Sequence, residues 1–129
     1  MPSRHLIFLD SPKAESGGIL IEGEPATPGR RVSLKRRRSP WDPDRDIERI
    51  IIGSHPARAD VLIQAEGVKP EHVRLYLPLR GEGDNDLKVM VDGTVEVNGR
   101  QVLHDEWYAL KSGDQLGLGK WLFCFEEAS

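Results

Sequence analysis

Two short segments near the middle of the sequence carry side chains that could bind a charged or polar partner. They span residues 54–60 and 64–71, and each follows a short aliphatic run. Hydroxyl, imidazole and cationic groups donate hydrogen bonds to carbonyl, carboxylate or phosphate oxygens. Because both segments also contain glycine or proline, we expect two loops that present such groups to a partner. The candidate groups are Ser54, His55, Arg58 and Lys69.

The sequence argues against a metal site. Asp42, Asp44 and Asp46 have the opening spacing of a calcium loop, but Ile47 stands where that loop needs glycine and Gly53 where it needs a bidentate glutamate. The histidines are dispersed, without the paired spacing of zinc ligands. They are His5, His55, His72 and His104. We therefore expect neither a metal nor a cofactor.

No group of residues has the pattern of a catalytic site. Residues 113–120 are one residue too long for a phosphate-binding loop, and Trp121 stands where serine or threonine would bind magnesium. Cys124 alternates with Phe123 and Phe125, which favours a small buried side chain over a nucleophile. We therefore expect that the protein is not an enzyme.

A basic segment from Arg30 to Arg38 leaves two interpretations open. It could bind nucleic acid or another polyanion, or it could be a strand edge and loop whose cations are solvated and discourage edge pairing. We favour the second, because the only aromatic residue nearby is Trp41. The cations are Arg30, Arg31, Lys35, Arg36, Arg37 and Arg38.

Composition suits one soluble domain. The chain has 129 residues, 38% of them hydrophobic, and a formal net charge of −3, so it has no overall basic field for nucleic acid. Its one cysteine cannot form an internal disulfide, which fits a reducing compartment, and no apolar run is long enough for a membrane span. We expect a cytoplasmic protein.

Short apolar runs with period-two alternation, separated by turn residues, predict an all-β protein. Residues 73–77 alternate in this way, and Asn98-Gly99 is a strong hairpin signal. No long helical periodicity is present. We predict an antiparallel β-sandwich of about ten or eleven short strands. Residues 1–18 would form an arm or first strand, residues 19–126 the sandwich and residues 127–129 a tail.

The central and C-terminal motifs resemble those of the forkhead-associated (FHA) domain, a β-sandwich of the FHA/SMAD-like type that commonly binds phosphothreonine peptides. Order and spacing hold over about residues 47–125. The matching motifs are Ile52-Gly53-Ser54, Asp60-Val61-Leu62-Ile63, Val68-Lys69-Pro70-Glu71-His72, Asp92-Gly93-Thr94, Val97-Asn98-Gly99, Gly113-Asp114 and Leu118-Gly119.

The resemblance implies that phosphothreonine recognition is weakened or lost. In the family an arginine and a serine grip the phosphate, and an asparagine fixes the peptide backbone. Here Ser54, Lys69 and Asp92 stand at those positions. The missing guanidinium removes charge-assisted hydrogen bonds, each worth ~1.5–3 kcal/mol, and Asp92 would repel a dianion. The resemblance gives His72 a structural role as a buried loop brace.

We therefore expect a protein-interaction module that binds a protein or peptide partner, with or without phosphothreonine. Two alternatives stay open: phosphothreonine binding through Arg58 and Lys69, aided by the Ser54 hydroxyl, and polyanion binding through the basic segment. The candidate partner-binding residues are Ser54, His55, Arg58, Lys69, Asp92 and Asn98, and the structural ones are Gly53, His72 and Gly99.

Two residues could accept a phosphate themselves. Thr27 precedes Pro28 in an expected exposed connection, and Ser33 follows Arg30 and Arg31 at the spacing that basophilic kinases use. Both are hypotheses from local sequence.

Overall fold

The computed structural model describes residues 3–10, 18–35, 47–78, 85–90, 94–104 and 106–128. Several residues named in the sequence analysis lie outside these ranges: Arg36, Arg37, Arg38, Trp41, Asp42, Asp44, Asp46, Asp92 and Gly93. The described residues form thirteen strands and no helix. None of them is therefore part of a helix that could cross a membrane.

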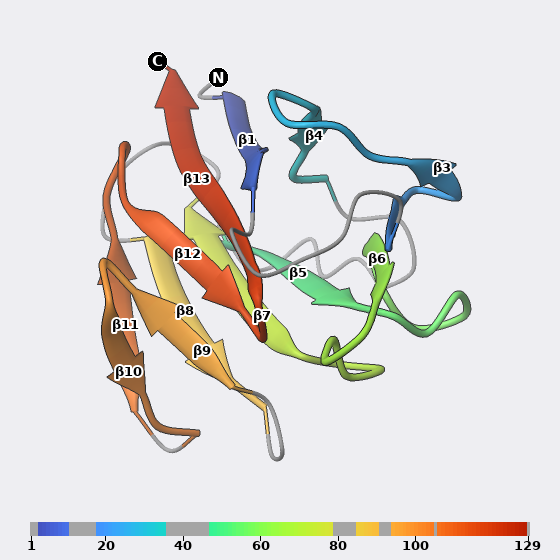
Figure 1. Cartoon of the computed structure of the whole chain (residues 1–129). Coiled ribbons are helices and arrows are strands. Elements are labelled where there is room, and N and C mark those ends of the chain that lie inside the picture. Colours follow the sequence, from blue (N-terminus) through green and yellow to red (C-terminus); the bar gives the residue numbers. More distant parts are fainter. Residues whose placement is uncertain are drawn as a thin grey trace.

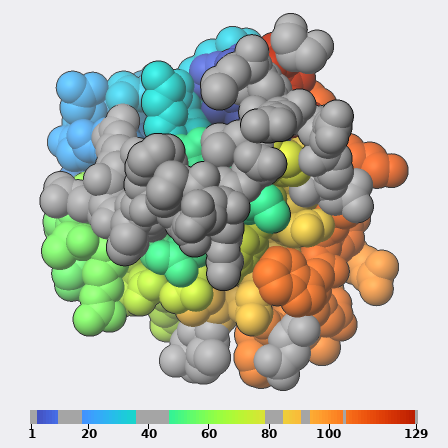
Figure 2. Space-filling model, turned by 180° about the vertical axis from the view of Figure 1, so that it is seen from behind, coloured from blue at the N-terminus to red at the C-terminus, as the bar shows by residue number. Residues whose placement is uncertain are grey.

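The strands form two packed sheets (Figure 1). The six-stranded sheet has the order β10-β9-β12-β13-β1-β4, and the seven-stranded sheet has the order β11-β8-β7-β5-β6-β2-β3. Seen from behind, the visible surface passes from green, for the middle of the sequence, through yellow to orange, for its C-terminal part (Figure 2).

The six-stranded sheet consists of β1 (Ser3–Asp10), β4 (Arg31–Ser33), β9 (Val95–Val97), β10 (Arg100–Val102), β12 (Gln115–Leu118) and β13 (Trp121–Ala128). The seven-stranded sheet consists of β2 (Ile19–Ile21), β3 (Glu24–Pro25), β5 (Ile47–Gly53), β6 (Val61–Ala65), β7 (Val73–Pro78), β8 (Asn85–Val89) and β11 (Trp107–Leu110).

The predicted antiparallel sandwich is confirmed, with one parallel pair. Strands β5 and β6 are parallel, and only Ile52 and Gly53 find partners, in Val61 and Leu62. Because the end of β5 pairs with the start of β6, the chain continues forward and needs no long return connection. The residues between them bulge out as a loop at this end of the sheet.

Thirteen described strands exceed the predicted ten or eleven. The shortest, β3, is two residues long and contains Pro25. Because proline has no N–H to donate to a neighbouring strand, sequence patterns do not predict a strand at such a position. Strand β1 lies between β13 and β4, and β13 runs to Ala128. The division of the chain at residues 18 and 126 stays a prediction.

The core lies between the sheets, because alternate residues of each strand point inward. Leu6, Phe123 and Phe125 come from the six-stranded sheet and are fully buried. Ile50, Ile52, Leu75 and Leu87 face them from the seven-stranded sheet and are also fully buried. Burying each such side chain stabilises the fold by roughly 1.5–3 kcal/mol.

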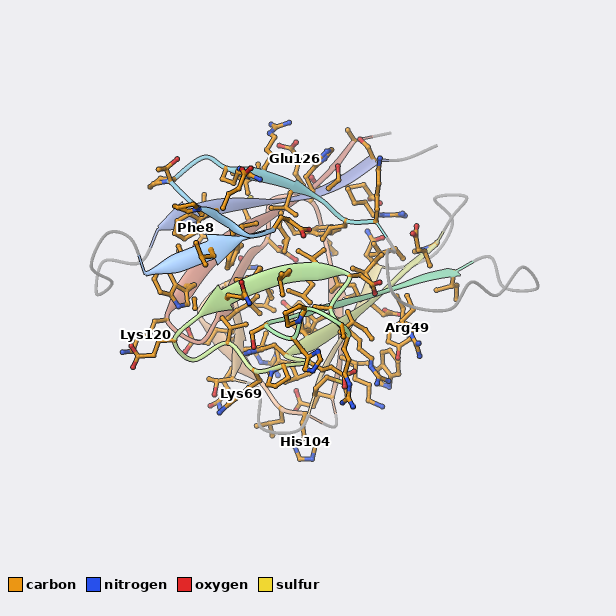
Figure 3. All side chains as sticks on the ribbon, turned by 90° about the vertical axis from the view of Figure 1, so that its right-hand side faces the viewer. Phe8, Arg49, Lys69, His104, Lys120 and Glu126 are labelled. Carbon is orange, nitrogen blue, oxygen red and sulfur yellow. The ribbon has the colours of Figure 1, made fainter. Side chains whose placement is uncertain are left out.

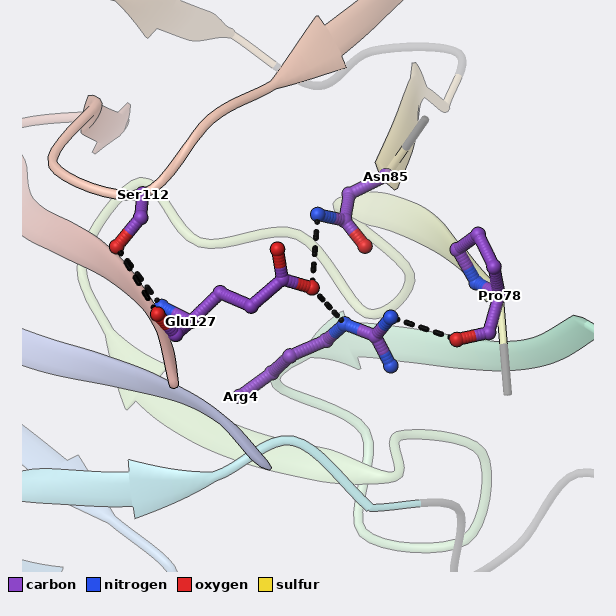
Figure 4. A network of polar contacts seen from close by, with 5 residues as sticks. All are labelled: Arg4, Pro78, Asn85, Ser112 and Glu127. Atoms are coloured by element: carbon purple, nitrogen blue, oxygen red, sulfur yellow. Dashed lines mark hydrogen bonds and ion pairs between the residues drawn. The ribbon is translucent and has the colours of Figure 1, made fainter. Parts of the chain in front are cut away.

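A buried polar network joins the two sheets where β7 ends (Figure 4). Arg4 of β1 donates from Nε to Glu127 Oε2 at 2.8 Å and from Nη2 to the Pro78 carbonyl at 2.6 Å. Asn85 Nδ2 donates to the same Glu127 oxygen at 3.2 Å. Because β7 runs from Val73 to Pro78, this network lies at the opposite end of β7 from the loop that precedes Val73.

Candidate functional site: the apical loops

The two loops expected from the sequence lie side by side at one end of the seven-stranded sheet. We call residues 54–60 the first apical loop and residues 66–72 the second. Ser54 N–H donates to the Lys69 carbonyl at 2.9 Å, and His55 N–H donates to the Pro70 carbonyl at 3.3 Å. These backbone bonds make the two loops one surface, and Figure 3 looks onto the end of the molecule that carries it.

Gly53 makes this close approach possible. A Cβ atom at position 53 would lie 2.0 Å from the Pro70 carbonyl oxygen and 2.6 Å from the Pro70 carbonyl carbon. No side chain fits there unless the backbones of the loops move apart. The glycine is thus required by backbone packing and not by an unusual φ angle.

His72 braces three segments from a fully buried position. Its Nδ1 accepts a hydrogen bond from Lys69 N–H at 3.0 Å, and its Nε2 lies 2.8 Å from the Thr94 carbonyl. Since Nδ1 must keep its lone pair for Lys69, Nε2 carries the proton and the ring is neutral. His72 N–H also donates to the Ile52 carbonyl at 2.9 Å, which ties the second apical loop to β5.

Burial favours this neutral form. Loss of hydration lowers the pKa of His72 below 6.5. The hydrogen bond to the Thr94 carbonyl raises this pKa, and the nearby Lys69 charge lowers it further. Protonation would also place a hydrogen on Nδ1, against the Lys69 N–H. The brace therefore works only with an uncharged ring.

Asp60 braces the first apical loop, a role that the sequence reasoning missed. Its carboxylate accepts from Ile51 N–H at 2.8 Å while its own N–H donates to the Ile51 carbonyl at 2.7 Å. His55 Nδ1 accepts from Ala57 N–H at 3.1 Å, so this imidazole also serves its own loop. An aspartate that opens a strand is a signal that could have suggested this role.

The Ser54 hydroxyl points into the protein. It donates to the Val68 carbonyl at 3.0 Å and is half-buried. Ser54 stands where the FHA resemblance places the phosphate-gripping arginine. Its side chain is thus used to hold the second apical loop.

The cations of the loops differ in their surroundings. Arg58 Nη1 and Arg74 Nη2 lie 3.5 Å from the two carboxylate oxygens of Glu71, each facing a different one. The Lys69 ammonium has no ion-pair partner within the described ranges and lies at the periphery of this end (Figure 3). Arg74 was missed by the sequence reasoning because it occupies an ordinary outward position of an alternating strand.

Asn98 lies away from these loops, at the far end of β9 from Thr94. It has a φ of 53°, and its side chain bonds Asp114 at 3.0 Å and Gln115 N–H at 2.9 Å. Gly99 follows with a φ of 83°. Both residues shape the turn between β9 and β10, which Asn98 fastens to the turn before β12.

The described part of the basic segment is largely paired. Arg30 lies 3.1 Å from Glu24, and Arg31 lies 3.2 Å from Glu126. Thr27 is exposed, whereas Ser33 is half-buried in β4. No cluster of three metal-ligating side chains occurs in the part of the chain that the structure describes.

No protein-family model and no curated protein sequence matches this chain. Solved structures do. The FHA domain of CT664 from Chlamydia trachomatis has a TM-score of 0.66 at 17% identity, with 98% of this chain and 99% of that one covered. The yeast Pml1 splicing factor has a TM-score of 0.65 at 16% identity, with 98% of this chain and 80% of that one covered.

A third neighbour is the MEK1 FHA domain, solved in complex with the HOP1 pThr318 peptide. It has a TM-score of 0.61 at 12% identity, with 98% of this chain and 97% of that one covered. The chain therefore has the FHA fold, which confirms the predicted resemblance at the level of the fold. The low identities agree with its divergence.

Proposed function

We propose that this chain is a non-catalytic protein-interaction module that holds a protein or peptide partner on the apical loops and does not require a phosphoryl group. The observation that carries this proposal is the Ser54 hydroxyl, which stands at the position of the phosphate-gripping arginine and donates to Val68. A neutral group engaged inside the protein supplies none of the charge-assisted bonds that a phosphate needs.

The braces support a binding role for the loops. His72, Asp60 and the backbone bonds between the loops fix the surface before any ligand arrives, which lowers the entropy cost of binding. The neighbours support the class of partner: MEK1 was solved with a peptide, and Pml1 was studied in its integration into the RES complex. A scaffolding or signalling role in the cytoplasm is part of this proposal.

Phosphothreonine binding through Arg58 and Lys69 is the main alternative. Against it, Arg58 already faces Glu71, and Lys69 is a point charge without the planar fork of a guanidinium. Polyanion binding by the basic segment has less support, since Arg30 and Arg31 face Glu24 and Glu126. Binding to generic DNA that falls steeply with salt would favour that second alternative.

Matched peptide libraries that differ only in threonine or phosphothreonine test the proposal. We expect ligands to be selected from the unmodified library and to bind within about threefold of their phosphorylated forms, a difference well below one charge-assisted bond. Binding that requires the phosphate and disappears in Arg58→Ala or Lys69→Ala would contradict the proposal.

A further inference from the structure

Glu71 places one carboxylate between two guanidinium groups from different parts of the fold. Arg58 comes from the first apical loop and faces Oε2, and Arg74 comes from β7 and faces Oε1. Both distances are 3.5 Å, whereas charge-assisted N–H···O bonds are usually about 2.7–2.9 Å. The carboxylate thus fits loosely in the space between the two cations.

The two arginines are not fully satisfied by this arrangement. The Arg74 side chain is 28% exposed, and its Nε is buried without a hydrogen-bond partner in the described part of the chain. The Arg58 side chain is 65% exposed and can follow a ligand. A phosphoryl monoester has three acceptor oxygens and nearly two charges at neutral pH, so it offers more acceptors and more charge than Glu71.

Lys69 adds a cation to the same loop as Glu71. Its ammonium has no ion-pair partner within the described ranges, and its charge is close enough to His72 to lower the pKa of that ring. The other acids of the apical loops face elsewhere: Asp60 accepts from Ile51 N–H, and Glu66 lies 3.9 Å from Lys120. Glu71 is the carboxylate that faces both Arg58 and Arg74.

We propose that Glu71 acts as a built-in anion that fills the space between Arg58 and Arg74 and thereby excludes phosphoryl groups from the apical loops. This inference rests on the proposed function, because it explains how the loops hold a partner without phosphate. It assigns the selectivity to Glu71 and the latent anion site to Arg58 and Arg74. The ligand class of the unmasked site is a single phosphoryl monoester, as on a phosphorylated peptide.

Glu71→Gln tests this assignment, with Glu66→Gln as the matched control. Both variants remove one negative charge from the second apical loop, but Glu66 is 85% exposed and faces Lys120 only loosely. The probes are N-acetyl-phosphothreonine amide, N-acetyl-threonine amide, inorganic phosphate and a generic single-stranded oligonucleotide, followed by NMR chemical shifts.

We expect Glu71→Gln to bind the phosphothreonine amide and inorganic phosphate about tenfold more tightly than the unsubstituted protein does. Glu66→Gln should change these affinities by less than about twofold, as an exposed charge pair would. Neither variant should bind the threonine amide. Adding Arg58→Ala or Arg74→Ala to Glu71→Gln should abolish the gain.

Equal gains in Glu71→Gln and Glu66→Gln would overturn the inference, because they would reflect overall charge alone. A gain that survives loss of both arginines, or an equal gain for the oligonucleotide, would overturn it too. Should Glu71→Gln unfold, Glu71→Ser provides the same comparison. If unmodified peptides bind elsewhere while Glu71→Gln still gains phosphate affinity, the proposed function fails and this inference stands.

Discussion

His72 connects the chemistry of a single side chain to the shape of the candidate site. Both of its ring nitrogens are used, one by Lys69 N–H and one by the Thr94 carbonyl. Because the ring is fully buried and must stay neutral to accept the Lys69 hydrogen bond, we expect the shape of the apical loops to depend on pH. The same residue thus links β5, the second apical loop and the start of β9.

The first prediction concerns this pH dependence. The pKa of His72 lies below 6.5 in the folded state. Between pH 6.5 and this folded pKa, the His72 ring is therefore protonated in the unfolded chain and neutral in the folded chain. The contribution of His72 to stability should be complete above pH 6.5 and lost as pH falls through the folded pKa. Denaturant titrations across this range should show the loss, and an NMR titration of the His72 ring should give the folded pKa.

Lys69→Ala serves as an internal check. Removing this cation should raise the pKa of His72, because the Lys69 charge lowers it in the native protein. The loss of stability should still begin near pH 6.5, where the unfolded chain takes up its proton, but it should end at a higher pH and be smaller in total. A His72 pKa at or above 6.5 in the native protein would contradict the neutral brace.

At the scale of elements, the junction of β5 with the two apical loops depends on Gly53. The predicted loops could be found from their turn residues, and a structural role for Gly53 was expected from sequence. The sequence could not show that the backbone packed against Gly53 is that of Pro70. Contacts of this kind depend on tertiary placement.

The second prediction is that Gly53→Ala separates the apical loops. The added Cβ would lie 2.0 Å from the Pro70 carbonyl oxygen, so the backbone must shift and the Ser54 to Lys69 bond must lengthen or break. We expect a loss of about 1–3 kcal/mol in the free energy of unfolding, as for an overpacked core, and faster hydrogen exchange at Ser54.

Gly117→Ala is the matched control in β12. There a Cβ would meet Glu96 Cβ at 3.5 Å, an ordinary contact, and the residue is also buried. This variant should unfold within about 1 kcal/mol of the unsubstituted protein. Equal stability losses in the two variants would refute the packing argument for Gly53.

At the scale of the whole molecule, the Arg4 network holds the sheets together at the far end from the apical loops. The Arg4 side chain is 6% exposed, whereas its partner Glu127 is 29% exposed (Figure 4). A partly buried carboxylate that loses its cation is costly, because neither water nor another charge replaces it fully.

The third prediction follows from this burial. Arg4→Met should reduce the free energy of unfolding by about 3 kcal/mol. Arg31→Met is the control on the neighbouring strand β4, where the arginine is 59% exposed and faces Glu126, and it should cost less than about 1 kcal/mol. Chemical denaturation of both variants measures the difference, and similar midpoints would show that the network adds little.

Much of this architecture could be predicted from sequence, because strands such as β7, β8 and β13 alternate between buried and less buried residues and the turns carry Gly, Pro and Asn. Strand β3 could not, since it is two residues long and contains Pro25. The site was predicted in part. Ser54, Arg58 and Lys69 were expected on two loops, but the placement of Arg74 against Glu71 depends on side-chain geometry that a strand pattern does not contain.

Asn98 also shows that local structure could be predicted from sequence whereas contacts between elements could not. Its turn was evident from Asn98-Gly99, yet its partners Asp114 and Gln115 are distant in sequence and meet it only through sheet pairing. Local patterns predict elements well because they depend on neighbours in the chain. Contacts between elements depend on the assembled sheets.

The most direct test of the proposed function is an amide chemical-shift map of this protein with a ligand selected from the unmodified peptide library. The account predicts that the largest changes fall on residues 54–60 and 66–72, and that the phosphorylated form of the ligand gives the same map without tighter binding. Changes confined to another face, such as that around the exposed Trp107, would contradict the central claim.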